Sequence, residues 1–162
     1  MSFVIRRGDE KDVPGMFRLI KELAEYERAP KDVINTEKML LEDGFGPKSI
    51  YKVFVAEEVS TNDIIGMALY YTAYSTWNGK IFYIDDIIVT ERYRRYGIGK
   101  KLVDLVLKEA HHEGLNQVRW HVLEWNTPAI EFYKKMKVVF DTEWTTCKMN
   151  KQQIADYVSG LK

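Results

Sequence analysis

The 162-residue sequence has a single cysteine, no excess of either charge and no long apolar run. One thiol, Cys147, cannot form an internal disulfide, and the first twelve residues contain no segment apolar enough for a signal peptide, so we expect a reducing, cytoplasmic location. No apolar run approaches the roughly 20 residues of a membrane span. The 24 basic and 24 acidic residues cancel. We therefore expect neither a membrane nor a nucleic-acid partner.

Hydrophobic residues make up 46% of the sequence and charged residues 30%. This composition, without low-complexity tracts, is typical of a folded globule, and the length fits one domain over residues 1–162. Apolar residues repeat with the periods of strands and helices, and turn residues separate these segments. This pattern predicts an α/β (α+β) fold on a mixed sheet. The expected strands are 3–7, 51–58, 64–74, 80–89, 117–125, 138–144 and 145–149, and the expected helices are about 12–27, 36–44, 100–114, 126–136 and 151–160.

The stretch YRRYGIGKK, residues 93–101, lies where an apolar strand leads into a helix. Backbone N–H groups at a helix N-terminus lack intrahelical partners and attract anions. Gly97 and Gly99 allow an anion to approach the main chain closely. Four side chains add positive charge suited to a diphosphate: Arg94, Arg95, Lys100 and Lys101. We predict a pyrophosphate-binding turn here.

Two other phosphate-binding motifs are excluded by spacing. A dinucleotide fingerprint requires a third small residue where this chain has Leu102, and no βαβ unit opens the sequence. A P-loop requires glycine at the place of Arg94 and serine or threonine at the place of Lys101. The remaining pattern is Arg-x-x-Gly-x-Gly, from Arg94 to Gly99.

With this pattern the sequence resembles the GNAT superfamily of acetyl-coenzyme A-dependent N-acetyltransferases, whose pyrophosphate loop is (Arg/Gln)-x-x-Gly-x-(Gly/Ala). The polyamine (spermidine/spermine) and thialysine branch is similar over nearly the whole chain, in the stretches FVIRR, RLIKELAEYE, TEKMLLEDGFG, YYTAYSTWNGK, IDDIIV, YRRYGIG and EWNTPAIEFYKK. The resemblance implies a GNAT fold, with a mixed, mostly antiparallel central sheet flanked by helices. It also implies acetyl-CoA as co-substrate and a homodimer.

The resemblance implies a role for particular residues. Asn126 would contact acetyl-CoA and Tyr133 would be the general acid near its sulfur. Asp85 would lie by the amine and connect to it through water. The main chain at Ile87, Ile88 and Val89 would hold the acetyl and pantetheine arm, and the pyrophosphate would be wrapped by Arg94, Arg95, Tyr96, Gly97, Ile98, Gly99 and Lys100. The substrate site would be lined by Tyr26, Glu27, Arg119, Trp120 and His121.

The chemistry of amine acetylation requires these residue types independently. An alkylammonium with a pKa near 10.4 is only about one part in a thousand neutral at pH 7, so a base such as Asp85 is needed. Strand alternation predicts that Asp85 and Asp86 point to opposite faces, and we expect chemistry at Asp85. Of the acidic residues on the first helix, Glu22 and Glu25 are expected to be solvated. Glu27 is a candidate for binding a distant ammonium.

The substrate itself is less well defined by the sequence. Trp77 is a candidate wall of an alkylamine channel through cation–π contacts. Before it, Ser75 and Thr76 replace the acidic residue and proline expected in polyamine enzymes, so a diamine, a thialysine-like amine or an amino-acid side chain remains open. Lys137 stands where the family resemblance implies a glycine, and a left-handed backbone at Lys137 would cost about 1 kcal/mol of strain. Adjacent His111 and His112 diverge on a helix, so no metal is expected.

We therefore predict transfer of acetyl from acetyl-CoA to a primary amine of a small polycationic molecule such as a polyamine, diamine or thialysine. Direct attack would be assisted by a tyrosine general acid and a carboxylate or water base. The alternatives are a protein or peptide lysine N-acetyltransferase and a non-catalytic acetyl-CoA-binding regulator. Tyr133 and Asp85 distinguish an enzyme from a non-catalytic regulator, because a protein that only binds acetyl-CoA needs neither residue.

Overall fold

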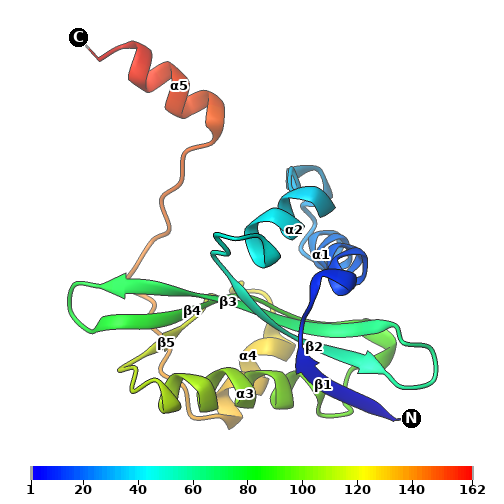
Figure 1. The fold of residues 1–162 in the computed structure, drawn as a ribbon. Helices are drawn as coiled ribbons and strands as arrows, with labels where there is room; N and C mark the ends of the chain where they lie inside the picture. The colour runs from blue at the N-terminus through cyan, green and yellow to red at the C-terminus, as the bar shows by residue number, and fades with distance from the viewer. Residues whose placement is uncertain (1, 162) are drawn as a thin grey trace. The chain divides into compact units, whose positions relative to one another are not determined.

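A computed structural model describes residues 2–161 of the chain (Figure 1). They divide into two compact units, Met1–His121 and Val122–Lys162, which are described separately below. The single domain expected for residues 1–162 stays a prediction.

The first unit is built on one five-stranded sheet of order β1-β2-β3-β4-β5. Strands β1 to β4 pair antiparallel, and β5 pairs parallel with β4. The mixed, mostly antiparallel sheet expected from the sequence is confirmed. The strands are β1 (Phe3–Arg7), β2 (Lys52–Glu58), β3 (Ile64–Ser75), β4 (Gly79–Val89) and β5 (Val118–Arg119).

The α-helices are α1 (Val13–Tyr26), α2 (Glu37–Phe45), α3 (Ile98–His112), α4 (Thr127–Lys135) and α5 (Lys151–Ser159), with short 3-10 turns at Glu10–Asp12, Pro30–Asp32 and Glu91–Tyr93. Side-chain caps explain why several begin where they do. Thr36 accepts from the N–H of Met39 at the start of α2, and Asn150 accepts from Gln153 at the start of α5. Gly44 does not end α2 as expected. It lies inside the helix, where a Cβ would be 2.2 Å from the ring of Tyr51.

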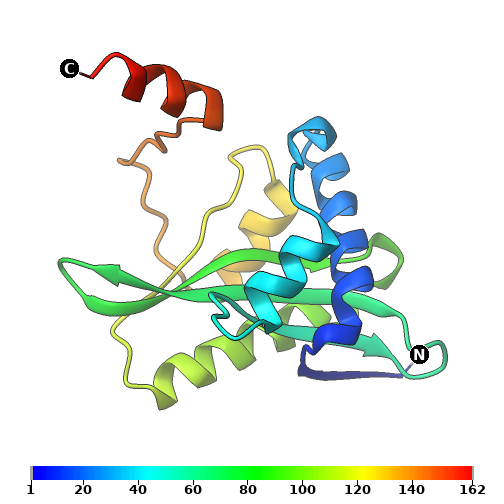
Figure 2. The same cartoon turned by 45° about the horizontal axis from the view of Figure 1, so that its top comes forward.

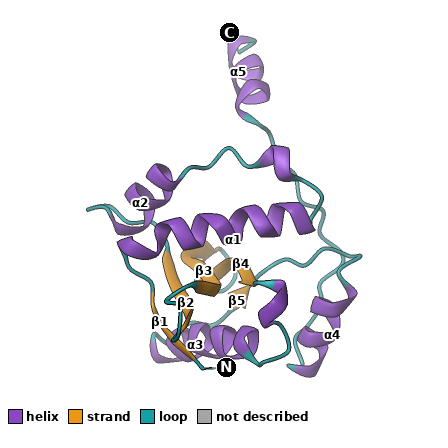
Figure 3. Cartoon of the chain, turned by 90° about the vertical axis from the view of Figure 1, so that its right-hand side faces the viewer, coloured by secondary structure: helices purple, strands orange, loops and turns teal. Residues whose placement is uncertain are grey.

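In the first unit, α1 and α2 cover one face of the sheet and α3 covers the other (Figures 2 and 3). Strand alternation supplies a separate apolar core to each face. The α1-side core contains Met16, Leu19, Val55, Met67, Leu69 and Ile88. The α3-side core contains Phe54, Tyr70, Phe82, Ile84, Leu102 and Val106.

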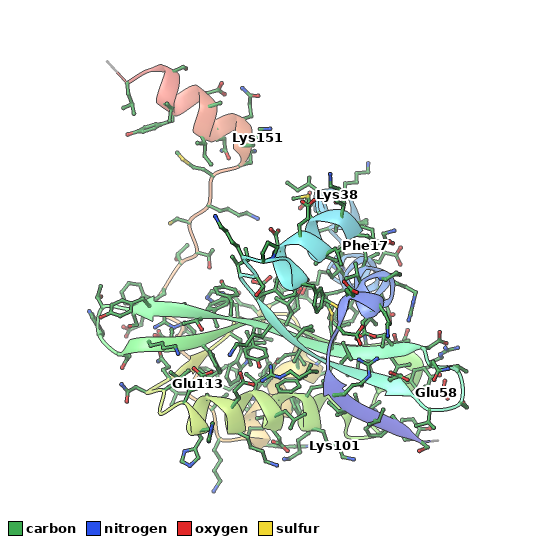
Figure 4. The ribbon with its side chains drawn as sticks, viewed as in Figure 1. Phe17, Lys38, Glu58, Lys101, Glu113 and Lys151 are labelled. Atoms are coloured by element: carbon green, nitrogen blue, oxygen red, sulfur yellow. The ribbon has the colours of Figure 1, made fainter. Side chains whose placement is uncertain are left out.

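Ion pairs fasten the C-terminal half of α3 to the sheet. Glu109 accepts hydrogen bonds from Arg7, Tyr70 and Lys52. Glu113 pairs with Lys52 at 3.1 Å and with Lys80 at 2.7 Å. In Figure 4, Glu113 lies near the end of α3 that runs beneath the β3–β4 hairpin, and Lys101 lies at the opposite end.

The second unit differs from the sequence prediction. No described residue of 138–149 forms a strand, so the strands expected at 138–144 and 145–149 are wrong. Apolar composition favours a strand only where another strand supplies hydrogen-bond partners. Here Val139 is 93% exposed and Trp144 74% exposed. The strand expected at 117–125 is also reduced, to β5 alone. Lys137 has φ +58°, so it adopts the left-handed backbone that strains a residue with a side chain.

Candidate active site

A β-bulge in β4 positions two neighbouring carboxylates. In the register with β3, Ile84 lies opposite Tyr70 and Asp86 lies opposite Leu69, so Asp85 is the extra residue. Because Leu69 packs in the α1-side core, Asp86 faces that side of the sheet. A bulge interrupts strict alternation. The charges of Asp85 and Asp86 both act on Tyr83. The expectation that the two carboxylates point to opposite faces stays a prediction.

Three acidic residues of this region form what we call the acidic trio: Glu27, Asp85 and Asp86. Burial, together with the charges of Asp85 and Glu27, raises the pKa of Asp86 to about 7. Burial also raises the pKa of Asp85 and of Glu27. Among residues 2–161, none of the three has an ion-pair partner. Ionised carboxylates without such a partner attract a cation, and a carboxyl group with a pKa of about 7, as at Asp86, can accept a proton near neutral pH.

An aromatic wall adjoins the trio on the same face of the sheet. The rings of Tyr71 and Tyr83 lie 5.3 Å apart, and the ring of His121 lies 5.6 Å from that of Tyr83. The hydroxyl of Tyr83 contacts Nδ1 of His121. Arg119 is the register partner of Tyr83 on β5. The structure therefore brings two of the predicted substrate-site residues, Arg119 and His121, close to Tyr83.

Two other predicted substrate residues lie elsewhere. Trp120 packs against the α3-side core, on the opposite face from Arg119 and His121. Trp77 is 85% exposed in the turn between β3 and β4. At about 3.3 Å per residue, the strand separates the start of β4 from Asp85 by roughly 20 Å. In this chain Trp77 does not join the acidic trio.

The end of β4 has one open edge. Strand β5 pairs with β4 only at Phe82 and Tyr83. From Asp86 to Val89, β4 pairs with β3 along its other edge. The main chain of Ile87, Ile88 and Val89 thus has polar groups available to an extended ligand, as an acetyl-pantetheine arm would require. The carbonyl of Val89 also accepts a hydrogen bond from Nε of Arg94 at 3.1 Å.

The backbone of the turn after β4 is suited to binding a diphosphate. Gly97 has φ +78° at the N-cap of α3, and no side chain caps this helix. A Cβ on Gly97 would meet no atom within 4 Å, so the space beside this residue is open. Arg95 has φ +68°, a strained conformation for a residue with a side chain. Unsatisfied N–H groups with free access are what a phosphate group binds.

The side chains around the turn divide into two groups. Arg94, Arg95 and Tyr96 are exposed, while Lys100 is held by Asp104 at 2.7 Å. Lys101 lies over the ring of Phe3, 4.6 Å from its centre. Lys101 therefore packs against β1. The prediction that its charge contributes to the same turn is wrong.

One residue of this region was missed by sequence reasoning. Glu22 accepts hydrogen bonds from the hydroxyl of Thr90 at 2.9 Å and from the N–H of Glu91 at 3.0 Å. One helical turn later, the ring of Tyr26 lies 5.0 Å below the guanidinium of Arg94. The expected solvated role of Glu22 is wrong, because α1 uses it to hold the start of the glycine turn. The available signal was the i, i+4 spacing of Glu22 and Tyr26 on one helix face.

The remaining predicted residues lie in the second unit. Tyr133 is buried, with 7% of its surface exposed. Burial raises the pKa of its hydroxyl to about 12, so it keeps its proton at neutral pH. The side chain of Asn126 caps α4 by accepting from the N–H of Ala129.

Comparison with known proteins identifies the class. Residues 15–137 match the model of the Acetyltransferase (GNAT) family. A thialysine N-epsilon-acetyltransferase of Bos taurus is 41% identical over 143 residues, which is 84% of each chain. The spermidine/spermine N(1)-acetyltransferase-like protein 1 of Homo sapiens is 30% identical, over 95% of this chain and 23% of that protein.

Solved structures show the same fold. An integron cassette protein from V. cholerae has a TM-score of 0.78 at 22% identity, over 99% of both chains. An aminoglycoside acetyltransferase from an uncultured soil metagenomic sample has a TM-score of 0.73 at 22% identity, over 91% of this chain and 95% of that one.

The fold and the turn after β4 thus define an acyltransferase. The chain belongs to the acetyltransferase (GNAT) family and is an N-acetyltransferase, similar to the thialysine and polyamine branch. The resemblance and the fold inferred from the sequence are both confirmed. Among the described residues, no helix is long and apolar enough to cross a membrane. Within the same residues, no three His, Cys, Asp or Glu side chains are grouped as a metal site requires.

Proposed function

We propose that this enzyme transfers the acetyl group of acetyl-CoA to a primary amine of a small cationic molecule. The observation that carries the proposal is the acidic trio without cationic partners, located beside the open edge of β4. A protonated amine would supply the missing positive charge. The names of the bovine and human relatives, which refer to thialysine and to spermidine or spermine, support small amines as the substrate class.

The first step is to bind the co-substrate. The N–H groups at the start of α3 and the guanidinium of Arg95 would hold the diphosphate. The main chain of Ile87, Ile88 and Val89 would align the extended arm, and Asn126 would contact the co-substrate from α4. Bound acetyl-CoA supplies an activated acetyl group. A backbone N–H of this edge would stabilise the negative charge that develops on the acetyl oxygen, a contribution of roughly 3 kcal/mol per donor.

The second step is to neutralise the amine. Asp85 would accept the ammonium proton, directly or through water, because only the neutral amine attacks a thioester. Asp86, whose pKa is raised to about 7, would share this proton with Asp85, since two close carboxylates do not ionise independently. Glu27 would attract the cation from α1. Tyr133, protonated at neutral pH, would donate a proton to the departing thiolate.

The proposal is tested by an acetylation screen with labelled acetyl-CoA. The candidate acceptors are thialysine, lysine, ornithine, short diamines, spermidine, spermine and a lysine peptide. We expect a small amine to be acetylated. If the peptide alone were acetylated, the enzyme would be a protein lysine acetyltransferase. Calorimetric binding of acetyl-CoA without acetylation of any acceptor would indicate a regulator.

The role of Tyr133 is tested in the same assay. We expect Tyr133→Phe to lower kcat tenfold or more, because it removes a proton donor, while acetyl-CoA binding by calorimetry stays unchanged. Phe132→Leu is the matched control, because it alters the neighbouring ring and leaves the hydroxyl. Full kcat for Tyr133→Phe across the pH range would exclude Tyr133 as the acid. A homodimer and a cytoplasmic location remain predictions.

A further inference from the structure

We propose that Arg119 binds a carboxylate of the substrate, so that the site prefers an amino-acid amine over a diamine or polyamine. This inference rests on the proposed function and specifies its substrate. The structural basis is a separation of charge along one face of the sheet. Arg119 lies opposite Tyr83 of the aromatic wall, and Asp85 of the acidic trio lies two residues further along β4.

The strand pattern determines the direction of Arg119. On β5 and the residues after it, Val118 and Trp120 pack against the α3-side core. Alternation therefore directs Arg119 and His121 to the opposite face, where His121 contacts Tyr83. The positive charge of Arg119 also acts to lower the pKa of Tyr83, against the effects of burial and of the acidic residues. The guanidinium thus lies within electrostatic range of the wall.

Arg119 differs from the other basic residues of the sheet in its partners. Arg6, Arg7, Lys52 and Lys80 each pair with a carboxylate. The guanidinium of Arg119 donates to the side-chain oxygen of Gln117 at 3.0 Å, and among residues 2–161 no carboxylate lies within ion-pair distance of it. An exposed guanidinium with remaining donors can bind a carboxylate in bidentate geometry.

The spacing of the two ends fits an amino acid with a terminal amine. Arg119 lies opposite Tyr83, and Asp85 is two residues further along β4. Two residues advance about 7 Å along a strand and neighbouring strands are about 4.8 Å apart, so the two backbones are separated by roughly 8 Å. In extended lysine, six bonds of roughly 1.5 Å join the carboxyl carbon to the side-chain nitrogen, a span of about 7–8 Å. An extended lysine is therefore about as long as the separation between these two backbone positions.

A substrate with cations at both ends fits less well. If one ammonium lies at the acidic trio, the other lies near Arg119, where like charges repel. Lysine places its α-ammonium there as well, but its carboxylate offsets that charge and is attracted to Arg119. The charge distribution therefore selects between two molecules of equal length that differ only in the carboxylate.

The experiment compares lysine with 1,5-diaminopentane, its decarboxylated counterpart, and includes thialysine and spermidine. We expect the unaltered enzyme to have a kcat/KM at least tenfold higher for lysine or thialysine than for the diamine. Arg119→Ala should reduce this ratio at least tenfold by raising the KM for the amino acid. The same variant should acetylate the diamine as well as before or better, which shows that it is folded. Arg119→Lys should retain part of the preference.

Lys38→Ala is the control, because it removes one exposed positive charge from α2, where Lys38 pairs with Glu42. It should leave the ratio unchanged. The proposal is overturned if the unaltered enzyme acetylates the diamine or spermidine as efficiently as the amino acids, or if Arg119→Ala weakens both classes equally. Those outcomes leave the proposed function intact. Acetylation of no small amine would overturn both.

Discussion

The first unit contains two groups of acidic residues on opposite faces of one sheet, and they differ in their partners. On the α3 side, Glu109 and Glu113 accept hydrogen bonds from lysine, arginine and tyrosine, and these contacts lower the pKa of both residues. On the α1 side, burial raises the pKa of Glu27, Asp85 and Asp86, and at Asp86 the charges of Asp85 and Glu27 raise it further. The first group stabilises the fold. The second costs stability and is available for a ligand.

This difference separates the effects of substitution on stability and on activity. Removing a partner from the first group should weaken the fold and leave the chemistry unchanged. Neutralising a member of the second should weaken the chemistry and leave the fold intact or more stable. The predictions below test this separation.

The largest effect is expected for Asp85→Asn. The amide is nearly the same size but cannot accept the ammonium proton, so kcat/KM should fall by about 10²-fold or more. Calorimetric affinity for acetyl-CoA and the melting temperature should remain close to those of the unaltered enzyme. Glu25→Gln is the control, because it neutralises an acid on α1 outside the trio. Retention of more than half of the activity by Asp85→Asn would remove Asp85 from the mechanism.

Glu109→Gln should have the opposite profile. The amide cannot replace the charge that accepts hydrogen bonds from Arg7, Tyr70 and Lys52. We expect the free energy of unfolding to fall by about 1–3 kcal/mol, measured by urea denaturation. The kcat of the folded protein should not change. A loss of kcat with no loss of stability would contradict the distinction between the two groups.

The pH dependence of stability should also separate the groups. Asp86 has a folded-state pKa of about 7, far above the value of about 3.9 in an unfolded chain. Between these pH values the folded state holds a proton that the unfolded state has released, so stability falls as pH rises. Asp86→Asn should therefore raise the melting temperature more at pH 8 than at pH 5.

Glu109 should show the reverse behaviour. Its folded-state pKa is lowered, so its contribution to stability is present above the unfolded value of about 4.3 and is lost as pH falls through the folded value. The loss in free energy of unfolding caused by Glu109→Gln should be constant from pH 6 to 8 and should shrink below about pH 4. For Asp86→Asn, a larger rise in melting temperature at pH 5 than at pH 8 would show that ionisation of Asp86 does not destabilise the folded state.

The smallest effect is expected for Glu22→Gln. The amide can still accept from Thr90 or Glu91, but with a neutral oxygen that forms weaker hydrogen bonds. The glycine turn should be held less firmly, and we expect the KM for acetyl-CoA to rise about threefold, an energy of roughly 0.6 kcal/mol. The KM for the amine should stay constant. Glu25→Gln serves again as control, and an equal rise in both KM values would argue against a role specific to the turn.

Local patterns in the sequence were sufficient for most of the first unit. Apolar period and turn residues located the strands of the sheet, and the spacing of Arg94, Gly97 and Gly99 located the turn at the start of α3. Short-range signals also placed the starts of α2, α4 and α5 close to the observed caps Thr36, Asn126 and Asn150. These features depend on contacts between residues a few positions apart, which a single sequence displays directly.

Long-range contacts decided the rest. The bulge at Asp85 depends on the register of β4 against β3, and the role of Glu22 depends on a hydrogen bond to a residue 68 positions away. The strands expected at 138–144 and 145–149 had the required composition but found no neighbouring strand among the described residues. The sequence by itself determined which segments can become helices, strands and an anion-binding turn, because these follow from local backbone preference. Only the tertiary structure decided which carboxylates are paired, because pairing depends on side chains that folding brings together from distant parts of the chain.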